Sequence, residues 1–306
     1  MPPMMPQKSG IALTVKNLDF KYDSAEEATL KGINMELPKG ARCLLLGKNG
    51  SGKSTFLRIV GGRHLAKPDD SVILLGRHAF RDTQLNMVRS YLDMDWGMRT
   101  VSFTGYGIPL QADIAVKNMM SKLQSDYPER RDELIELLGV DPEWRMHQVS
   151  DGQRRRVQLL LGLVRPFEIL LLDEITTSLD VIVRQDLLHW LRKESEIRGA
   201  TIIYATHIFD GLDDWPTHLT YFTGEGKTGW QGLLNEIPLY NELKKSGKPV
   251  LLSLACDWLR REQEHLKENK IKEIASGNSI IENSYKPYIS GGGFAPGRLA
   301  GNIDNS

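Results

Sequence analysis

A short apolar run that leads directly into a glycine-rich loop constrains the fold of this chain more than any other feature. The run is Cys43-Leu44-Leu45-Leu46, which is typical of a buried strand. The loop matches the pattern G-x-x-x-x-G-K-[ST], and a helix-forming stretch follows it, so strand, loop and helix come in the order expected of a phosphate-binding loop. Its residues are Gly47, Lys48, Asn49, Gly50, Ser51, Gly52, Lys53, Ser54 and Thr55.

This loop predicts that the chain binds the phosphates of a nucleotide. Its glycines let the backbone turn tightly and direct N–H groups at phosphate oxygens, and the helix that follows adds its positive N-terminus. We expect Lys53 to reach the β- and γ-phosphates and Ser54 to ligate Mg²⁺. The alternative, a glycine-rich turn with a chance lysine, is disfavoured by the strand and helix on either side.

A second apolar run, residues 169–172, ends in the two carboxylates Asp173 and Glu174. Ligands of parallel α/β sheets bind at the carboxyl ends of the strands, so these side chains are placed for a site there. Asp173 would hold Mg²⁺, directly or through water, and Glu174 would polarise or deprotonate an attacking water. Alternatively, the pair only ends the strand with polar groups, but the phosphate loop favours the functional interpretation.

Strands that alternate with helices predict an α/β fold with a largely parallel sheet. Apolar runs at residues 72–75, 169–172 and 201–205 are the further strand candidates, and residues 11–15 and 33–37 alternate as half-buried strands do. Helical patterns cover residues 112–123 and 130–138. Apolar residues at helical spacing, among them Leu251, Leu254 and Trp258, predict an amphipathic helix over Val250–Ala275.

Composition excludes several classes of protein. Of the 306 residues, 41% are hydrophobic and 25% are charged, as in ordinary globular proteins, and 39 basic side chains balance 39 acidic ones. A nucleic-acid partner is therefore not favoured, and Arg154-Arg155-Arg156 is better explained as a solvated or dimer-facing helix start. The apolar runs are too short to span a bilayer, and two cysteines without metal-ligand spacing fit a reducing compartment, so we expect a cytoplasmic or nuclear protein.

Four further motifs resemble those of the nucleotide-binding domains of ABC ATPases, and the resemblance covers residues 11–235. Val149-Ser150-Asp151-Gly152-Gln153 is similar to the family signature LSGGQ, and Ser178-Leu179-Asp180 is similar to the D-loop. His207 in Ala205-Thr206-His207 is similar to the switch histidine. Tyr22 is similar to the aromatic residue that stacks on adenine.

The resemblance implies a P-loop NTPase fold of the ABC nucleotide-binding-domain type. Such a domain has a RecA-like core with a parallel sheet, an antiparallel β subdomain and a helical subdomain, here at about residues 97–165. We expect residues 1–10 to be a disordered lead-in and residues 11–235 to be the nucleotide-binding domain. Residues 236–275 would form a C-terminal helical extension, and residues 276–306 a flexible glycine-rich tail.

The resemblance also implies a nucleotide sandwich, in which the signature of a second domain covers ATP held by the phosphate loop of the first. Because the chain has one loop and one signature, it would pair head-to-tail as a homodimer, or with a paralogue as a heterodimer. Lys53, Glu174 and His207 would be the catalytic residues. The signature residues that would contact the partner's ATP are Ser150, Asp151, Gly152 and Gln153. Asp180 would belong to the D-loop, and Ser54 and Asp173 would hold Mg²⁺.

Two departures from the family pattern bear on function. Asp151 replaces the second signature glycine, and its carboxylate would be costly near ATP unless it caps the signature helix, which we favour, or faces a cation. The Q-loop glutamine is not evident, since Asp93 or Asp95 stands near its place. Transmission to a membrane subunit, which that loop usually serves, is therefore in doubt.

Sequence around two of the motifs narrows the resemblance to a small group of soluble ABC proteins from fungi and plants. Trp144-Arg145-Met146-His147 and residues 204–211 carry the likeness. In plants these proteins fall in ABC subfamily I, and the fungal member is a partner of the transcription-regulating Not complex. The implied function is an ATP-driven switch on a partner complex. The alternatives are the ATPase subunit of a transporter with separately encoded membrane subunits, or an ATP-dependent scaffold with little turnover.

Overall fold

The computed structural model describes residues 10–94, 96, 113–247 and 249–275. Residues up to Glu262 form one compact unit, and a second unit begins at Gln263. Among the described residues, no helix combines the length and the apolar character needed to cross a membrane. The expected lead-in at residues 1–10, except Gly10, and the expected tail at residues 276–306 lie outside the described part.

In the described part of the chain, six strands form the larger sheet, in the order β10-β9-β3-β8-β7-β6. All neighbours are parallel except β10 and β9, which confirms the predicted parallel core. Its strands are β3 (Arg42–Leu46), β6 (Arg89–Leu92), β7 (Ile169–Asp173), β8 (Thr201–Ala205), β9 (His218–Phe222) and β10 (Thr228–Leu233).

The central strands β3, β7 and β8 are buried along their whole length, because both faces of the sheet are covered. Leu44 and Leu170 belong to a hydrophobic cluster that includes residues of α5 (Asp151–Leu163) and α6 (Val181–Arg198). Their neighbours Cys43 and Leu171 belong to a second cluster, with α1 (Lys53–Val60) and the smaller sheet. Continuous apolar runs therefore mark these strands, as expected for a sheet buried on two sides.

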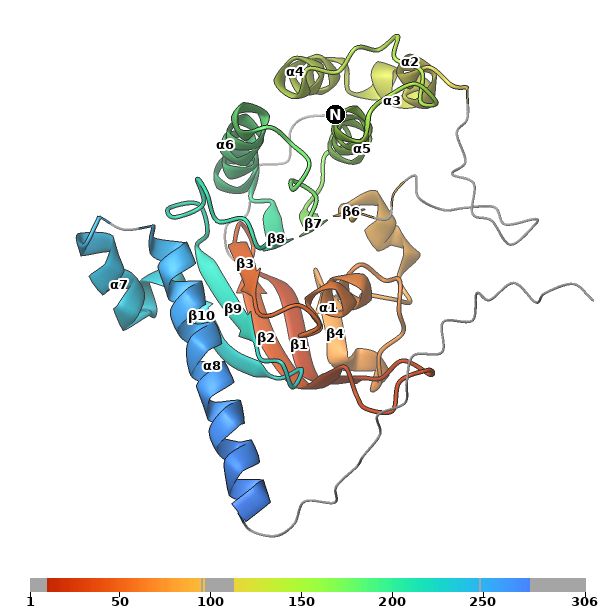
Figure 1. The fold of residues 1–306 in the computed structure, drawn as a ribbon. Helices are drawn as coiled ribbons and strands as arrows, with labels where there is room; N and C mark the ends of the chain where they lie inside the picture. Colours follow the sequence, from red (N-terminus) through yellow and green to blue (C-terminus); the bar gives the residue numbers. More distant parts are fainter. Residues whose placement is uncertain (1–9, 95, 97–112, 248, 276–306) are drawn as a thin grey trace, which may run out of the picture. The chain divides into compact units, whose positions relative to one another are not determined.

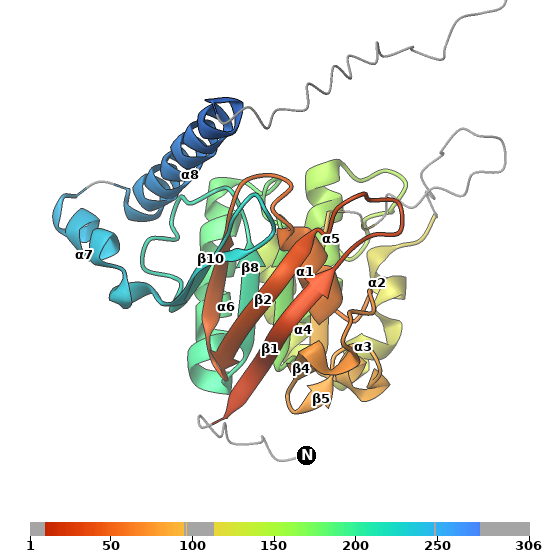
Figure 2. The ribbon, with the colours of Figure 1, turned by 90° about the horizontal axis from the view of Figure 1, so that it is seen from below.

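The smaller sheet is antiparallel, with the order β2-β1-β4-β5, and its long strands β1 and β2 lie side by side in Figure 2. It corrects one prediction, because the run at residues 72–75 was expected in the parallel sheet. That run forms β4, which pairs antiparallel with Leu13, Thr14 and Val15. A four-residue apolar run carries no signal of strand direction. The strands are β1 (Ile11–Phe20), β2 (Leu30–Pro38), β4 (Val72–Leu74) and β5 (Arg77–His78), and the 3-10 helices η1 (Asp69–Ser71) and η2 (Thr83–Met87) lie beside them in sequence.

The helical region contains α2 (Val116–Met119), α3 (Ser121–Asp126) and α4 (Pro128–Leu138), which gather near α5 in Figure 1. The helix predicted at residues 112–123 is wrong as one element, because the chain breaks at Met120 between two short helices. Helix α4 is confirmed and begins two residues earlier than predicted, with a proline in its first turn.

A buried ion pair joins α4 to α6. The guanidinium of Arg130 donates to both carboxylate oxygens of Glu194 at 2.8 and 2.7 Å, and its Nε donates to the Leu163 carbonyl at 2.8 Å. The two side chains are only 10% and 9% exposed. The helical region is thus fixed to the core by a charge pair that has little access to water.

Replacing one partner of this pair is expected to destabilise the protein strongly. In Glu194→Ala the Arg130 charge stays buried without its carboxylate, which costs about 3–5 kcal/mol. Chemical denaturation would measure this loss. Glu143→Ala is the matched control, since Glu143 is 67% exposed beside Lys117 and such surface pairs contribute about 0–1 kcal/mol. Equal losses in the two variants would show that the buried pair does not hold the helical region.

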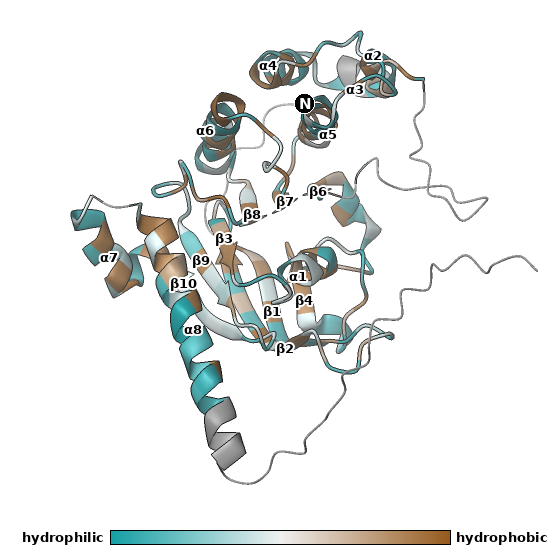
Figure 3. Cartoon of the chain, in the orientation of Figure 1, coloured by the Kyte–Doolittle hydropathy of each residue, from teal (hydrophilic) through white to brown (hydrophobic). Residues whose placement is uncertain are grey.

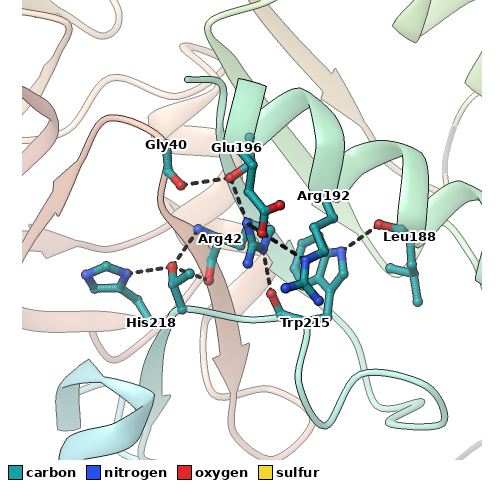
Figure 4. A network of polar contacts seen from close by, with 9 residues as sticks. Gly40, Arg42, Leu188, Arg192, Glu196, Trp215 and His218 are labelled. Atoms are coloured by element: carbon teal, nitrogen blue, oxygen red, sulfur yellow. Dashed lines mark hydrogen bonds and ion pairs between the residues drawn. The ribbon is translucent and has the colours of Figure 1, made fainter. Parts of the chain in front are cut away.

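A second buried arginine secures the start of β3, as Figure 4 shows. Arg42 donates from Nε to the Trp215 carbonyl at 2.6 Å and from a terminal nitrogen to the Ser195 hydroxyl at 3.1 Å. It also pairs with Glu196 at 3.2 Å. Because Ser195 and Glu196 lie on α6, the strand that leads into the phosphate loop is tied to the helix that follows Asp180.

The described part of the chain ends in η3 (Leu234–Glu236), α7 (Pro238–Lys245) and α8 (Val250–Ala275). Helix α8 has the bounds predicted for the amphipathic helix. Leu251, Leu254 and Ala255 are buried in the core, with Trp258 packed partly against it. Figure 3 shows this N-terminal part of α8 as apolar and the following turns as hydrophilic.

Candidate active site

The phosphate loop connects β3 to α1, as predicted. Two positions of the loop have a backbone conformation that favours glycine. Gly47 has a φ of 146°, and a Cβ there would lie 2.4 Å from the Phe222 carbonyl oxygen, while Gly52 caps α1 with a φ of 94°. No side chain caps the N-terminus of α1. The first backbone N–H groups of this described helix therefore stay available for an anion.

The Lys53 side chain folds back over the phosphate loop. Its ammonium donates to the carbonyls of Gly47 at 2.7 Å and Lys48 at 3.0 Å. Burial lowers the pKa of Lys53, while the nearby carboxylates of Glu174 and Asp173 act in the opposite direction. The charge thus stands between the loop and the two acidic residues, where a phosphate would meet it.

Asp173 ends β7 beside the start of α1. Its Oδ1 accepts from the Ser54 hydroxyl at 3.0 Å, and its Oδ2 accepts from the Tyr91 hydroxyl at 3.4 Å. Burial raises the pKa of Asp173, which the Ser54 bond partly opposes. A hydroxyl and a desolvated carboxylate at this distance are the oxygen ligands that Mg²⁺ prefers, so the predicted pair fits this ion.

Glu174 and His207 face each other across the ends of β7 and β8. His207 Nδ1 lies 2.8 Å from Glu174 Oε2, and both side chains are accessible to solvent. Glu174 has a φ of 53°, which is unusual for a residue other than glycine, and its N–H donates to the Ala205 carbonyl at 2.9 Å. The strained backbone turns the carboxylate out of the buried strand toward the loop.

A cavity of about 530 Å³, a size suited to a mononucleotide, brings Lys53, Ser54, Glu174 and His207 together. Asp173 is not among the described residues that line it. Sequence reasoning did not identify Thr29, which carries no motif signal because it only precedes β2. Lys48 was predicted to bind ATP, yet among the described residues its side chain lies against Gly224 and is not part of the lining. The cavity is lined by Thr29, Asn49, Gly50, Gly52, Lys53, Ser54, Thr55, Glu174 and His207.

Tyr22 stands next to the loop, with its hydroxyl 3.1 Å from the Thr55 hydroxyl. Its ring packs edge-on against Phe20 and His64, with centroids 4.9 and 5.5 Å apart. The ring is partly exposed, so one face can receive a base.

If Tyr22 stacks on adenine, Tyr22→Ala should weaken ATP binding by about 5- to 150-fold, because base stacking on an aromatic side chain contributes about 1–3 kcal/mol. Titration with a fluorescent ATP analogue would measure this. Tyr22→Phe is the matched control, which keeps the ring and loses only the bond to Thr55, and it should bind almost as wild type does. An unchanged affinity in Tyr22→Ala would place the base elsewhere.

The signature residues begin α5. Ser150 is the N-cap, its hydroxyl accepts from Gln153 N, and the Gln153 side chain accepts from Ser150 N at 2.8 Å. Asp151 was expected to cap this helix, and that expectation is wrong, because Ser150 takes the cap. Asp151 is 94% exposed in the first helical turn and stands 3.9 Å from Arg154. It faces a cation, which was the other alternative.

Asp180 is the N-cap of α6, and its Oδ1 accepts from Val183 N at 3.0 Å. Its other oxygen pairs with Arg156 of α5. Ser150, Asp151, Gly152 and Gln153 all lie within the described part of the chain, and the lining of the cavity includes none of them. The chain therefore does not bring its own signature to its own phosphate loop.

Asp93, one of two candidates for the Q-loop position, is buried and held in place. Its carboxylate pairs with Arg63, and its carbonyl accepts from Arg155 at 2.9 Å and Gln158 at 2.8 Å. It is not among the described residues that line the cavity. The other candidate, Asp95, lies outside the described residues.

A phosphate loop at the end of a parallel strand, with acidic residues at the end of a nearby strand, defines the class of P-loop nucleoside triphosphatases. Residues 30–177 match the family model described as ABC transporter. ABC transporter I family member 20 of Arabidopsis thaliana is 42% identical, over 97% of this chain and 92% of that protein. The chain belongs to the ABC transporter family and is one of its ATP-hydrolysing cassettes.

Other relatives support the resemblance to a fungal and plant group. CCR4-associated factor 16 of Saccharomyces cerevisiae is 37% identical over 72% of this chain and 78% of that protein. Among solved structures, a dimeric ATP-binding cassette in a post-hydrolysis state with ADP and phosphate is similar, with a TM-score of 0.59. This match covers 72% of our chain and 98% of the solved cassette. At 22% identity this likeness confirms the ABC cassette fold alone.

Proposed function

We propose that the protein is an ATP-driven switch in which two copies, or one copy and a paralogue, bind ATP between them head-to-tail. One observation carries the proposal: the described residues that line the cavity include most of the phosphate loop, Glu174 and His207 but none of the signature of the same chain. A second chain must then supply Ser150, Gly152 and Gln153. The dimeric solved cassette supports this arrangement. The proposal also includes the predicted domain division, in which the nucleotide-binding domain begins at residue 11, the helical extension at residue 236 and the tail at residue 276.

In this proposal each residue near the phosphates has a separate role. Lys53 neutralises charge on the transferring phosphoryl group, and the N-terminus of α5 in the partner copy adds an anion site. Ser54 and Asp173 would hold Mg²⁺, which supplies charge neutralisation for the phosphates when it is bound. Glu174 accepts a proton from the attacking water, and His207 holds the carboxylate and contacts the γ-phosphate.

The closed dimer is favoured only while the γ-phosphate connects the loop of one copy to the signature of the other. Loss of that phosphate removes the shared ligand, so hydrolysis opens the dimer. We propose that a partner complex in the cytoplasm or nucleus reads the closed state, which the printed name of the CCR4-associated yeast relative supports. The missing Q-loop glutamine, near whose place Asp93 or Asp95 stands, favours this use over transport.

Of the two other candidate functions, one has a specific observation in its favour. An ATPase subunit for separately encoded membrane subunits is supported by a sulfate/thiosulfate import ATP-binding protein of Synechococcus elongatus, 31% identical over 66% of this chain. An ATP-dependent scaffold would use the same dimer with little turnover, but Glu174 and His207 stand in contact, which favours hydrolysis.

Affinity purification of the Glu174→Gln variant with ATP separates the candidates. We expect it to retain the closed dimer with a non-membrane partner complex, and we expect the same preparation with ADP to lose that complex. Stable recovery of an integral membrane subunit would favour the transporter function and contradict the switch.

A further inference from the structure

Helix α8 makes a direct polar contact with the turn between β9 and β10. Glu262 Oε1 accepts from the Gly224 backbone N–H at 2.6 Å, and Oε2 accepts from the Tyr221 hydroxyl. The neighbouring carboxylate holds the Tyr221 hydroxyl proton in place and, with burial as the larger cause, raises the pKa of Tyr221. One carboxylate therefore fixes both a strand residue and the turn that follows it.

Aromatic packing explains why α8 lies at this turn. The Trp258 ring contacts Tyr221, with centroids 5.2 Å apart, and Trp230, with centroids 5.9 Å apart. Trp258 is one helical turn before Glu262, so the two side chains are on the same face of α8. The packing brings the carboxylate to the turn, and the charge then makes hydrogen bonds stronger than those of a neutral group.

The same turn lies directly against the phosphate loop. A Cβ on Gly47 would be 2.4 Å from the Phe222 carbonyl oxygen, and a Cβ on Gly224 would be 1.8 Å from Lys48 Cε. These distances leave no space between turn and loop. Gly47 meets Phe222, the last residue of β9 before the turn, and Gly224 in the turn meets the side chain of Lys48. A shift of the turn would therefore disturb both loop residues, whose carbonyls accept from the Lys53 ammonium.

The turn also touches the other side of the cavity. A Cβ on Gly226 would lie 2.1 Å from the Thr29 carbonyl oxygen, and the Gly226 carbonyl accepts from Lys31 N at 2.8 Å. Thr29 lines the cavity. The turn thus supports two walls of the site, although it is not itself among the described lining residues.

We propose that Glu262 is a positioning residue for ATP binding, which holds the β9–β10 turn so that Gly47, Lys48 and Lys53 keep the geometry needed for phosphate. The proposal rests on the nucleotide site proposed above. It gives α8 a role in nucleotide binding, although the part of the chain that matches the family model ends at residue 177.

The test compares ATP binding by five full-length variants, measured by titration with a fluorescent ATP analogue. Glu262→Ala should bind about 5- to 10-fold more weakly, since a charged group's hydrogen bonds are lost, with kcat at saturating ATP changed less than about 2-fold. Glu262→Gln keeps an acceptor for Gly224 and should restore most of the affinity. Glu264→Ala removes the same charge from an exposed position two residues on, and should bind as wild type does.

Gly224→Ala is the fourth variant, and it guards against misfolding of Glu262→Ala. Its methyl group would lie 1.8 Å from Lys48 Cε and 2.8 Å from Glu262 Oε1, so it disturbs the same contact from the side of the turn and removes no group from α8. It should weaken ATP binding as Glu262→Ala does. If Glu262→Ala lowers Tm but binds ATP as Glu264→Ala does, α8 only stabilises the fold and the inference is overturned. If Lys53→Ala binds ATP as wild type does, the proposed nucleotide site itself fails, and the inference fails with it.

Discussion

Glu174→Gln is expected to lower the rate of ATP hydrolysis by about 100- to 10,000-fold while ATP binding is retained. The amide has the size of the carboxylate but cannot accept a proton from water. Phosphate release at saturating ATP measures the rate, and titration with a fluorescent ATP analogue measures binding.

The matched control is Glu168→Gln, the same change at an exposed glutamate just before β7. Glu168 pairs with Lys39 at 3.4 Å, away from the cavity, so its variant should hydrolyse ATP within about 2-fold of the wild-type rate. A normal rate in Glu174→Gln would assign the water-activating role to another group and contradict the account of Glu174 and His207.

Gly152→Asp should abolish ATP-dependent dimerisation and hydrolysis but leave ATP binding to the single chain intact. Gly152 lies in the first turn of α5, and it is not among the described residues that line the chain's own cavity. A carboxylate there would face the γ-phosphate held by the partner copy, where like charges repel. Light scattering with ATP and the ATP-analogue titration measure the two properties separately.

The neighbouring position offers a matched control. Asp151→Gly restores the second glycine of the family signature and removes a carboxylate that points to solvent and Arg154. It should dimerise and hydrolyse ATP at least as well as wild type. If Gly152→Asp still hydrolyses ATP at the normal rate, the signature does not complete the site and the head-to-tail arrangement is wrong.

Much of the site could be predicted because parallel topology brings distant motifs together. Asp173 and His207 are far apart in sequence, yet β7 and β8 pair in register and end at the same edge of the sheet as β3. Motif spacing also predicted the helix that Ser150 and Gln153 begin, although the choice of Asp151 as a capping residue was wrong.

The features that sequence could not predict depend on contacts between segments. Tyr91 reaches Asp173 only because β6 pairs with β7, and nothing in its local sequence marks it. Strand β4 was placed in the wrong sheet since a run of four apolar residues does not encode a direction. Glu262 is one glutamate among many on a charged helix, and only the packing of Trp258 brings it to the turn beside the phosphate loop.

The most direct test of the central claim is the mass of the Glu174→Gln protein in solution, measured by light scattering with Mg²⁺ and ATP and again with ADP. The account predicts a particle of twice the 34.6 kDa chain mass with ATP and a single chain with ADP. A single chain at saturating ATP would contradict the claim that ATP is bound between two copies.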